Sequence, residues 1–361
     1  MFELTELGND GALLGGRYRL ERFVARGGMG QIYAATDTWL SERVAVKLPL
    51  TGEVNHALAR HQLAREARLT RRVKHPGVCR IHGLRAHECG EDSTPMPFLA
   101  MDFVEGQRLG QRLWQGRLPL ALVAQIAQQV LSALAAVHDA GVCHLDLKSD
   151  NIILADVGGS YQAIIVDFGL AREADPHAEG SLHAVAGTPA YMAPEQIFGA
   201  APSPASDVYA FGILLFEMLT GQLPFVSRAE GSGITLLQRL HQVAPAPSSL
   251  VPELPAGWDE LVQRCLKLQR GERYRDAGMV LSAFEELWLD APASERAERD
   301  AGRGPGPAQS GRRPKDTRPL ATSALETPAL ETLTEQPRPS AGMPTTKRCR
   351  ALPACCTESA G

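Results

Sequence analysis

The alternation of hydrophobic and polar residues over the first hundred positions predicts a strand-rich region. It is loose over residues 17–24, a glycine-rich turn follows at 25–30, and short apolar stretches then recur. Residues 56–73 are instead predicted to form a helix. We therefore expect one helix among five strands, at residues 17–24, 31–35, 43–48, around 79–84 and 97–103.

From about residue 107 the pattern becomes helical. Residues 119–139 are predicted to form a long buried helix, because apolar residues recur there at helical spacing. Two short strands are expected next, and then four more helices. The strands are predicted at 152–154 and 163–166, and the helices at 204–220, near 233–243, 257–268 and 275–289.

One apolar segment is long enough to cross a bilayer. Residues 118–137 carry no formal charge. Polar side chains interrupt the segment at helical spacing, namely Gln125, Gln128, Gln129 and Ser132, so a buried core helix is the favoured interpretation. Residues 1–16 contain no basic region followed by an apolar run and are not expected to be a signal peptide. We therefore expect a cytoplasmic protein without a membrane partner.

Composition excludes several other classes of protein. The chain has 361 residues and a net charge of −4, which gives no reason to expect nucleic acid as a partner. Its seven cysteines match no zinc-site spacing, and their odd number argues against a disulfide framework. Cys355 and Cys356 are expected to be exposed free thiols, with redox sensing or lipidation as the alternative. Residues 290–361 are rich in Pro, Ala, Thr, Ser and Arg, and we expect a disordered tail there.

The candidate chemistry is concentrated in residues 144–151, which read His-Leu-Asp-Leu-Lys-Ser-Asp-Asn. This stretch places Asp146, Lys148 and Asn151 at short offsets, and a second carboxylate follows at Asp167 in an Asp-Phe-Gly triplet. Phosphoryl transfer needs such groups, because its catalysis is mostly positioning and electrostatic stabilisation. The first motif alone could arise by chance. The second makes chance a poor explanation.

Two features of the strand region fit the same chemistry. The glycines of residues 27–30 lie between two predicted strands, where backbone amides can approach a phosphate because no Cβ intervenes. Lys47 ends an apolar strand, where burying an unpaired ammonium group against the core would be unfavourable. Taken alone, the glycine turn could be a plain hairpin.

Together these motifs resemble those of protein kinases. Lys148 resembles the serine/threonine branch, and its neighbours are similar to bacterial eukaryotic-like serine/threonine protein kinases. The resemblance covers residues 17–289 and implies an α+β, two-lobed protein kinase fold. Its small β-rich N-lobe with one helix would span 17–103 and its larger helical C-lobe 104–289. Residues 1–16 would be an N-terminal extension, and 290–361 the tail.

The resemblance also implies a role for each site residue. Asp146 would orient the attacking hydroxyl and accept its proton, Lys148 would neutralise charge on the moving phosphoryl group, and Lys47 would pair with the α- and β-phosphates of ATP. Glu66 would hold Lys47, whereas the alternative is a surface Glu among arginines. Asn151 and Asp167 would bind Mg²⁺. The ATP phosphates would lie under residues Val24, Ala25, Arg26, Gly27, Gly28, Met29, Gly30 and Ile32, and the backbone of Asp102 and Val104 would bind adenine, with Met101 behind it.

Further residues are expected to support this set. Thr188 would hydrogen-bond Asp146 and Lys148, and Glu195 would form a buried ion pair with Arg273. Asp207 would cap amides at the start of its helix and also reach the backbone of residues 144–151. His144 is expected to be a core histidine with Phe168 packed near it.

Two positions depart from the family pattern. Ala25 replaces the first glycine of the phosphate loop, which makes that loop slightly stiffer. Leu145 replaces the arginine that usually grips a phosphate on the activation loop, and leucine cannot make a charge-assisted hydrogen bond. Residues 170–195 also offer few phosphate acceptors: Ser181, Thr188 and Tyr191. We therefore hypothesise that activity does not need phosphorylation of this segment.

Expected partners are protein substrates. The tail contains an Ala-Leu-Glu-Thr repeat at 324–327 and 329–332, for which low-complexity drift is one explanation. The alternative is that Thr327, Thr332 or Thr334 is autophosphorylated and recruits a phosphothreonine-reading domain. Rival functions are a pseudokinase scaffold, a small-molecule phosphotransferase and an adaptor that acts through its tail. The full catalytic set argues against the first and third. Residues 186–195, around Thr188, resemble the kinase segment that receives the peptide substrate, and this argues against the second.

Overall fold

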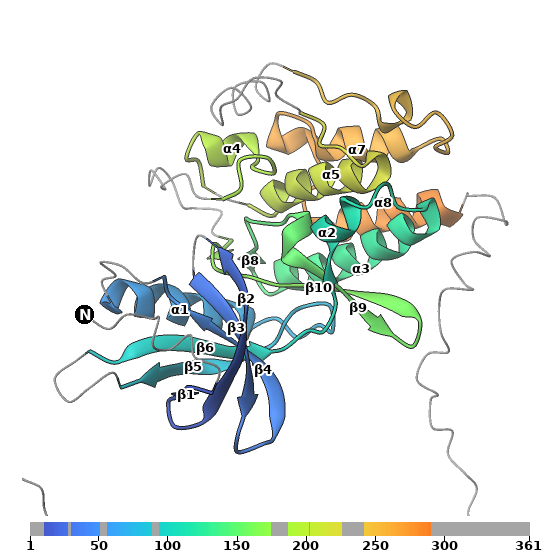
Figure 1. Cartoon of the computed structure of the whole chain (residues 1–361). Coiled ribbons are helices and arrows are strands. Elements are labelled where there is room, and N and C mark those ends of the chain that lie inside the picture. Colours follow the sequence, from blue (N-terminus) through green and yellow to red (C-terminus); the bar gives the residue numbers. More distant parts are fainter. Residues whose placement is uncertain are drawn as a thin grey trace, which may run out of the picture. The chain divides into compact units, whose positions relative to one another are not determined.

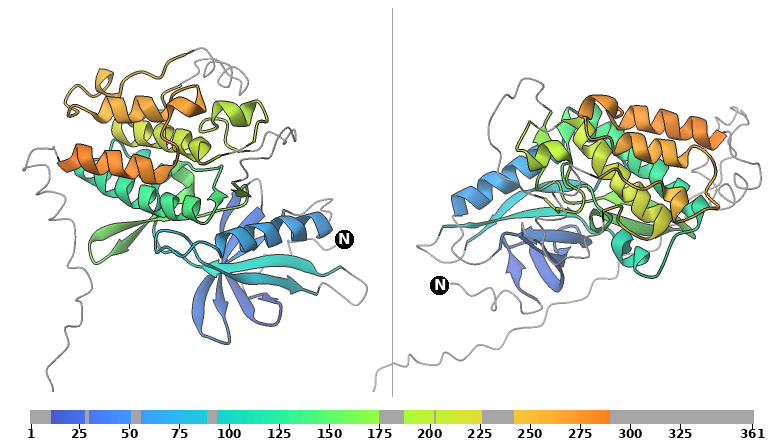
Figure 2. Two further views of the ribbon diagram at one scale, coloured as in Figure 1. Left: turned by 180° about the vertical axis from the view of Figure 1, so that it is seen from behind. Right: turned by 90° about the horizontal axis from the view of Figure 1, so that it is seen from above.

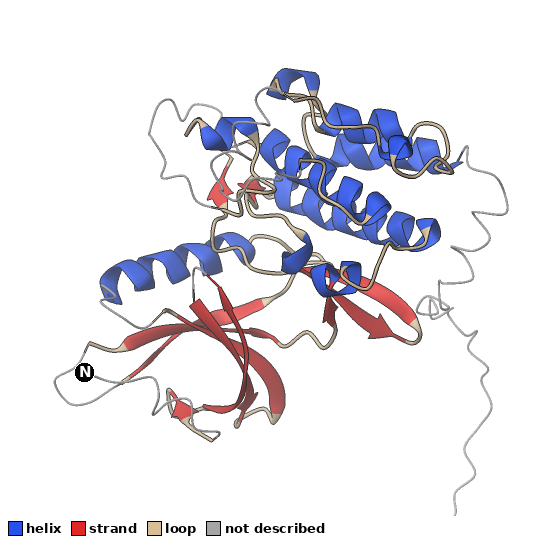
Figure 3. Ribbon diagram, turned by 45° about the horizontal axis from the view of Figure 1, so that its top comes forward, coloured by secondary structure: helices blue, strands red, loops and turns tan. Residues whose placement is uncertain are grey.

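The computed structural model describes residues 11–27, 30–50, 56–88, 94–174, 187–201, 203–225 and 242–289. They form two lobes, one built on an antiparallel sheet and the other mainly on helices (Figures 1 and 3). This arrangement confirms the predicted α+β, two-lobed fold. The expected helix near 233–243 and the tail at 290–361 lie outside the described residues.

The smaller lobe is a six-stranded antiparallel sheet with one helix against it (Figure 1). Its strand order is β1-β2-β3-β4-β6-β5. The helix α1, His56–Thr70, packs its apolar side on β5 and β6. The strands are β1 (Leu13–Leu14), β2 (Tyr18–Gly27), β3 (Gly30–Asp37), β4 (Glu42–Leu48), β5 (Ile81–His87) and β6 (Met96–Asp102).

The side chains of this sheet alternate between its two faces, and each face contributes to a separate hydrophobic core. In β4, Val44, Val46 and Leu48 face the core away from α1, whereas Ala45 faces the core shared with α1. Successive side chains of a strand point to opposite faces, so Lys47 shares the helix-facing side with Ala45. The strand β1 was not predicted, because its two residues are too few to show a period; it pairs with Tyr18 and Arg19.

The larger lobe is built around the apolar helices α3 (Leu120–Asp139) and α5 (Pro204–Thr220), as Figures 1 and 2 show. Shorter segments surround them. These are the helices α2 (Leu109–Leu113), α4 (Pro194–Ile197), α7 (Trp258–Cys265) and α8 (Ala277–Leu289), the 3₁₀ turns at Ser149–Asn151, Pro247–Ser249 and Arg270–Glu272, and the strands β7 (Gln107–Arg108), β8 (Val142–Cys143), β9 (Ile152–Val157), β10 (Ser160–Ile165) and β11 (Arg172–Glu173).

Within the described residues, α3 is the one helix long and apolar enough to cross a membrane. Val123, Ile126, Val130 and Leu134 are fully buried in the core of the larger lobe. This placement agrees with the predicted buried helix. The predicted strands at 152–154 and 163–166 are parts of one longer hairpin, β9–β10.

A buried ion pair joins distant parts of this lobe. Arg273 donates from both terminal nitrogens to Glu195, at 2.8 and 2.9 Å, as the sequence predicted. The same guanidinium also donates to the carbonyls of Lys267, Leu268 and Ala205. Burial alone would raise the pKa of Glu195, but the hydrogen bonds and charge of Arg273 hold it below its usual value.

We expect this pair to make stability depend on pH. The folded-state pKa of Glu195 is depressed, so its contribution is present above the ordinary value of 4.5 and lost as pH falls through the folded-state value. Glu195→Gln should therefore lower the free energy of unfolding by about 3–5 kcal/mol at pH 7. The difference from wild type should shrink as urea unfolding is repeated below the ordinary value. A difference that does not change with pH would contradict the assignment.

Close packing of α5 on α7 provides a second stability prediction. A Cβ at Gly212 would lie 2.7 Å from Cys265 Cβ and 2.9 Å from Leu266 Cδ2. Gly212→Val should therefore lower the free energy of unfolding by about 3 kcal/mol through overpacking. The matched control is Gly271→Val, because a Cβ at Gly271 meets no atom within 4 Å. Equal stability of the two variants in urea unfolding would refute the prediction.

Candidate active site

The loop at residues 144–148 leaves β8 and is tied to α5 by one buried carboxylate. Asp207 accepts the amides of His144 and Leu145, each at 2.7 Å, and also contacts His138 Nε2 at 3.0 Å. The helix begins at Pro204 after its N-cap residue Ser203. Asp207 therefore does not occupy the N-cap position, and its recorded hydrogen bonds go to the loop and to His138 of α3.

This tie holds an unusual backbone conformation. Leu145 has φ 66°, in the left-handed region that costs a residue with a Cβ about 1–2 kcal/mol. Its amide is held by Asp207, and its carbonyl accepts Gln196 Nε2 at 3.1 Å. The loop shape is thus fixed by hydrogen bonds to main-chain atoms, and the leucine side chain takes no part in them.

The carboxylate of Asp146 is surrounded by donors. Lys148 Nζ and Asn151 Nδ2 donate to its Oδ2, at 2.7 and 3.0 Å. The amide and hydroxyl of Thr188 donate to its Oδ1, at 3.1 and 3.2 Å. Lys148 Nζ also lies 2.6 Å from Thr188 Oγ1, so Thr188 meets both side chains that the sequence assigned to it. Four donors from three residues leave this carboxylate little freedom to rotate.

The β9–β10 hairpin brings together the two residues predicted to bind metal. Ile152 pairs with Ile165, so the residues just beyond the ladder are adjacent, and the amide of Val166 donates to the carbonyl of Asn151 at 2.9 Å. Asp167 follows directly, with φ 64°. The next residue, Phe168, packs edge-on against His144 with ring centroids 4.6 Å apart. His144 is fully buried and is a core histidine, as predicted.

Lys47 joins the two lobes through three charge-assisted hydrogen bonds. Its Nζ lies 2.9 Å from both carboxylate oxygens of Glu66 on α1 and 2.7 Å from Asp167 Oδ1. Burial would lower the pKa of Lys47, but the two carboxylates raise it above its ordinary value, so the ammonium stays charged. Burial raises the pKa of Glu66, whereas Lys47 holds the pKa of Asp167 below its usual value against the effect of burial.

The charges of this site fit a bound divalent cation. The carboxylates of Glu66, Asp146 and Asp167 exceed the ammonium groups of Lys47 and Lys148 by one. Asp167 and Asn151 would supply carboxylate and amide oxygens, which Mg²⁺ prefers, with phosphates completing its coordination. Across the described ranges no group of three His, Cys, Asp or Glu side chains could hold a metal alone. The residues therefore suit a metal that is bound together with a nucleotide.

The predicted phosphate loop joins β2 to β3. Gly27 pairs with Gly30, and Arg26 pairs with Gln31, while Gly28 and Met29 lie outside the described residues. A Cβ at Gly30 would fall 2.3 Å from the carbonyl oxygen of Leu48, so this position accepts only glycine. On the same ladders Ile32 pairs with both Ala25 and Lys47, which brings the loop residues beside the lysine, and a β-bulge interrupts the pairing near Val24.

The predicted adenine contacts lie at the end of β6. The amide of Asp102 already donates to the carbonyl of Arg80 at 2.9 Å. Asp102 can therefore offer adenine its carbonyl but not its amide. The sequence-based assignment of adenine binding to the backbone of Asp102 is thus restricted to the carbonyl. Met101 is buried behind this segment, and Val104 is half-buried.

Sequence reasoning missed a buried network beside the loop. Glu217 on α5 accepts a hydrogen bond from the Tyr191 hydroxyl and another from Ser149 Oγ at 3.3 Å. Burial raises the pKa of Glu217. The available signal was a lone carboxylate among the apolar residues 208–219 of α5. The network ties α5 to the residue after Lys148 and to the segment that follows Thr188.

Comparison with known proteins agrees with this geometry. Residues 18–287 match the protein kinase domain family. The chain is 36% identical over 302 residues to serine/threonine-protein kinase PknA of Mycobacterium tuberculosis, which covers 83% of this chain and 65% of that protein. It is 34% identical to serine/threonine-protein kinase pkn2 of Myxococcus xanthus and to the probable serine/threonine-protein kinase PknB of Bifidobacterium longum. These two matches cover 77% and 74% of this chain and 33% and 39% of the relatives.

The chain thus spans less than two thirds of the length of each of these relatives. The family match nevertheless covers most of the chain itself and includes every residue of the geometry described above. The chain belongs to the protein kinase family, among the bacterial eukaryotic-like serine/threonine kinases that its sequence resembles.

Proposed function

We propose that this protein is a serine/threonine-protein kinase that transfers the γ-phosphoryl group of ATP to hydroxyls of protein substrates, in a cytoplasmic signalling role. The observation that carries the proposal is the orientation of Asp146 by Lys148, Asn151 and Thr188. An inactive scaffold would have no use for a carboxylate held this way beside the Lys47, Glu66 and Asp167 cluster.

Each residue has a definite part in the proposed reaction. Asp146 accepts the proton of the attacking serine or threonine hydroxyl, and Lys148 stabilises the negative charge of the moving phosphoryl group. Lys47 holds the inner phosphates and is itself positioned by Glu66. Mg²⁺ bound at Asn151 and Asp167 would neutralise phosphate charge there. Residues 24–32 cover the phosphates, and the main chain at Asp102 and Val104 binds adenine.

The tail supplies the proposed sites of autophosphorylation. Thr327 and Thr332 end the two Ala-Leu-Glu-Thr repeats, and Thr334 follows shortly after. Phosphate on these residues would create a motif for a phosphothreonine-reading domain, since it adds charge and three acceptor oxygens.

Replacing the proposed base tests the reaction directly. Asp146→Asn should lower kcat by about 10²–10⁴-fold while leaving ATP affinity nearly unchanged, because it removes proton transfer but no phosphate contact. Mass spectrometry after incubation with Mg-ATP should find phosphate on substrate serine or threonine and on Thr327, Thr332 or Thr334 in wild type only. Asp150→Asn, an exposed carboxylate in the same loop, is the control and should keep wild-type turnover. Equal kcat for both variants would refute the role of Asp146, and an unmodified tail would refute autophosphorylation there.

The backbone anchoring of Leu145 predicts independence from activating phosphorylation. Asp207 and Gln196 fix the loop without any phosphate-binding side chain at this position. Wild-type protein stripped by a phosphatase, with removal checked by intact mass, should phosphorylate a peptide substrate at its former initial rate. A lag or a large loss of initial rate after stripping would contradict this expectation.

A further inference from the structure

The chain that leaves β6 receives little support from backbone hydrogen bonds. Among the described residues, no main-chain hydrogen bond is recorded for Phe103, Val104 or Glu105. The residues on either side are fixed, because the amide of Asp102 is already hydrogen-bonded and the backbone of Gly106 packs on β9. The amide and carbonyl of Val104, which are proposed to bind adenine, are thus open to a ligand. Their direction depends on the side chains of the neighbouring residues.

One arginine contacts the side chains on both sides of this open position. Val44 of β4 pairs with Asp102. The residue before Val44, Arg43, therefore lies beside Phe103, where the chain leaves the sheet. The guanidinium carbon of Arg43 is 4.5 Å from the centre of the Phe103 ring, within the range of a cation–π contact. Its Nη1 also donates to Glu105 Oε1 at 2.6 Å, so one side chain holds both neighbours of position 104.

Arg43 is itself held by the sheet. Its Nε donates to Glu21 Oε2 at 3.0 Å, and the other carboxylate oxygen accepts the hydroxyl of Thr36 at 2.5 Å. The hydrogen bond from Thr36 and the charge of Arg43 keep the pKa of Glu21 below its usual value, so this carboxylate is charged at neutral pH. The Arg43 side chain is 40% exposed, and a single surface pair of this kind would contribute little. Here two carboxylates and an aromatic ring share one guanidinium group, which fixes its position.

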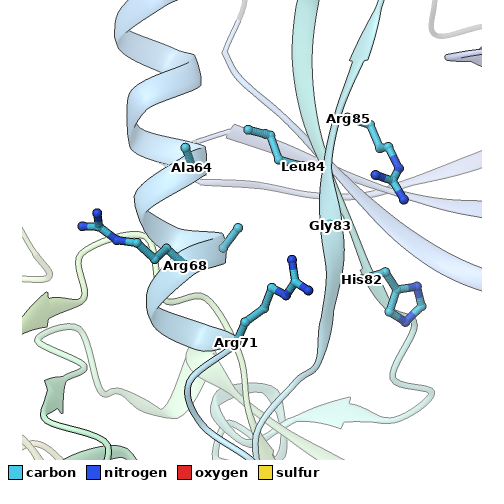
Figure 4. Close-up of a pocket in the computed structure, with 8 residues that line it drawn as sticks. Ala64, Arg68, Arg71, His82, Gly83, Leu84 and Arg85 are labelled. Atoms are coloured by element: carbon cyan, nitrogen blue, oxygen red, sulfur yellow. The ribbon is translucent and has the colours of Figure 1, made fainter.

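The segment is also held from β5, but only at its first residue. His82 Nε2 lies 2.6 Å from Asp102 Oδ1. Figure 4 shows the imidazole of His82 beside β5, pointing away from α1. Within the described ranges, the one recorded hydrogen bond of the Glu105 side chain is the bond to Arg43. The middle of the segment therefore depends on Arg43 more than on any other polar side chain.

We propose that Arg43 is a positioning residue for the nucleotide. Its contacts with Phe103 and Glu105 keep the main chain of Val104 in the orientation that binds adenine. Without them residues 103–105 would occupy several orientations, and the apparent affinity would fall in proportion to the fraction that remains competent. The inference rests on the proposed function for the place of adenine at this segment.

The geometry separates this role from attraction of the phosphates by charge. Lys47, which is proposed to hold phosphates, lies four residues further along β4, about 13 Å from Arg43 at the usual rise of a strand. That distance exceeds the screening length of about 8 Å at physiological salt. Loss of Arg43 should therefore weaken the binding of adenosine and of ATP by the same factor. The catalytic residues are untouched, so kcat should not change.

Displacement of a fluorescent ATP analogue from the full chain would measure both affinities. In Arg43→Gln, adenosine and Mg-ATP should each bind about three- to tenfold more weakly than in wild type, the order expected for a surface cation–π contact and an ion pair together. Initial rates of peptide phosphorylation should show the KM for ATP raised by a similar factor at unchanged kcat. Arg43→Lys keeps the charge but loses the planar fork, so it should recover only part of the affinity.

The matched control is Arg19→Gln, which removes the same charge from β2. Arg19 and Arg43 pair with Thr36 from its two sides, and Arg19 is exposed, with no side-chain hydrogen bond or ion pair recorded among the described residues. This variant should keep wild-type affinity for both ligands. Equal adenosine affinity in Arg43→Gln and Arg19→Gln would overturn the proposal. So would a loss confined to Mg-ATP, which would indicate attraction of the phosphates by charge.

Glu105→Gln keeps the proposal testable if Arg43→Gln does not fold, because the Glu105 side chain is 73% exposed. It should weaken adenosine binding about two- to threefold through loss of the ion pair alone, and unchanged affinity in this variant would also overturn the proposal. Thermal unfolding would show that each variant folds. Failure of the proposed function would look different: wild type would bind ATP without transferring phosphate, and the comparison of affinities would stand. A wild type that binds no adenine nucleotide would overturn both.

Discussion

The ion pairs of Lys47 are the interaction on which the rest of the structure depends. A buried ammonium is stable only with close opposite charges, and here they come from α1 and from the start of the Asp167–Gly169 segment. The position of α1 in the smaller lobe therefore depends on the larger lobe. The sheet, α1 and the segment that follows the β9–β10 hairpin are joined at Lys47 Nζ. The backbone of Lys47 pairs with Ile32, which lies next to the predicted phosphate loop.

The second constraint is the attachment of residues 144–151 to α5. An apolar helix in the middle of the larger lobe carries two carboxylates, and both are directed at this loop or its neighbours: Asp207 binds amides, and Glu217 binds hydroxyls. A helix packed on several sides moves little. Attachment to the core thus holds the loop in place. The strained backbone conformation at Leu145 is tolerated because its amide and its carbonyl are both hydrogen-bonded.

Much of this architecture could be predicted from the sequence, because short motifs and strand alternation are local signals. The pairing of Lys47 with Glu66 and of Glu195 with Arg273 was accessible through family resemblance. The hydroxyl network of Glu217 was not, since it joins residues far apart in sequence that carry no motif. The engaged amide of Asp102 was equally hidden, because it depends on where residue 80 crosses the strand end.

Gly106 lies where the chain passes from one lobe to the other, and its backbone is in close contact with β9. A Cβ there would fall 2.3 Å from the carbonyl oxygen of Leu154 and 2.9 Å from a methyl group of Ile153. The backbone of the chain that leaves β6 thus packs directly on β9, the strand that starts directly after Asn151. Any side chain at this point would push against the strand that directly follows the proposed metal ligand Asn151. The separation between the chain that leaves β6 and the strand that follows Asn151 is therefore set by backbone atoms in direct contact.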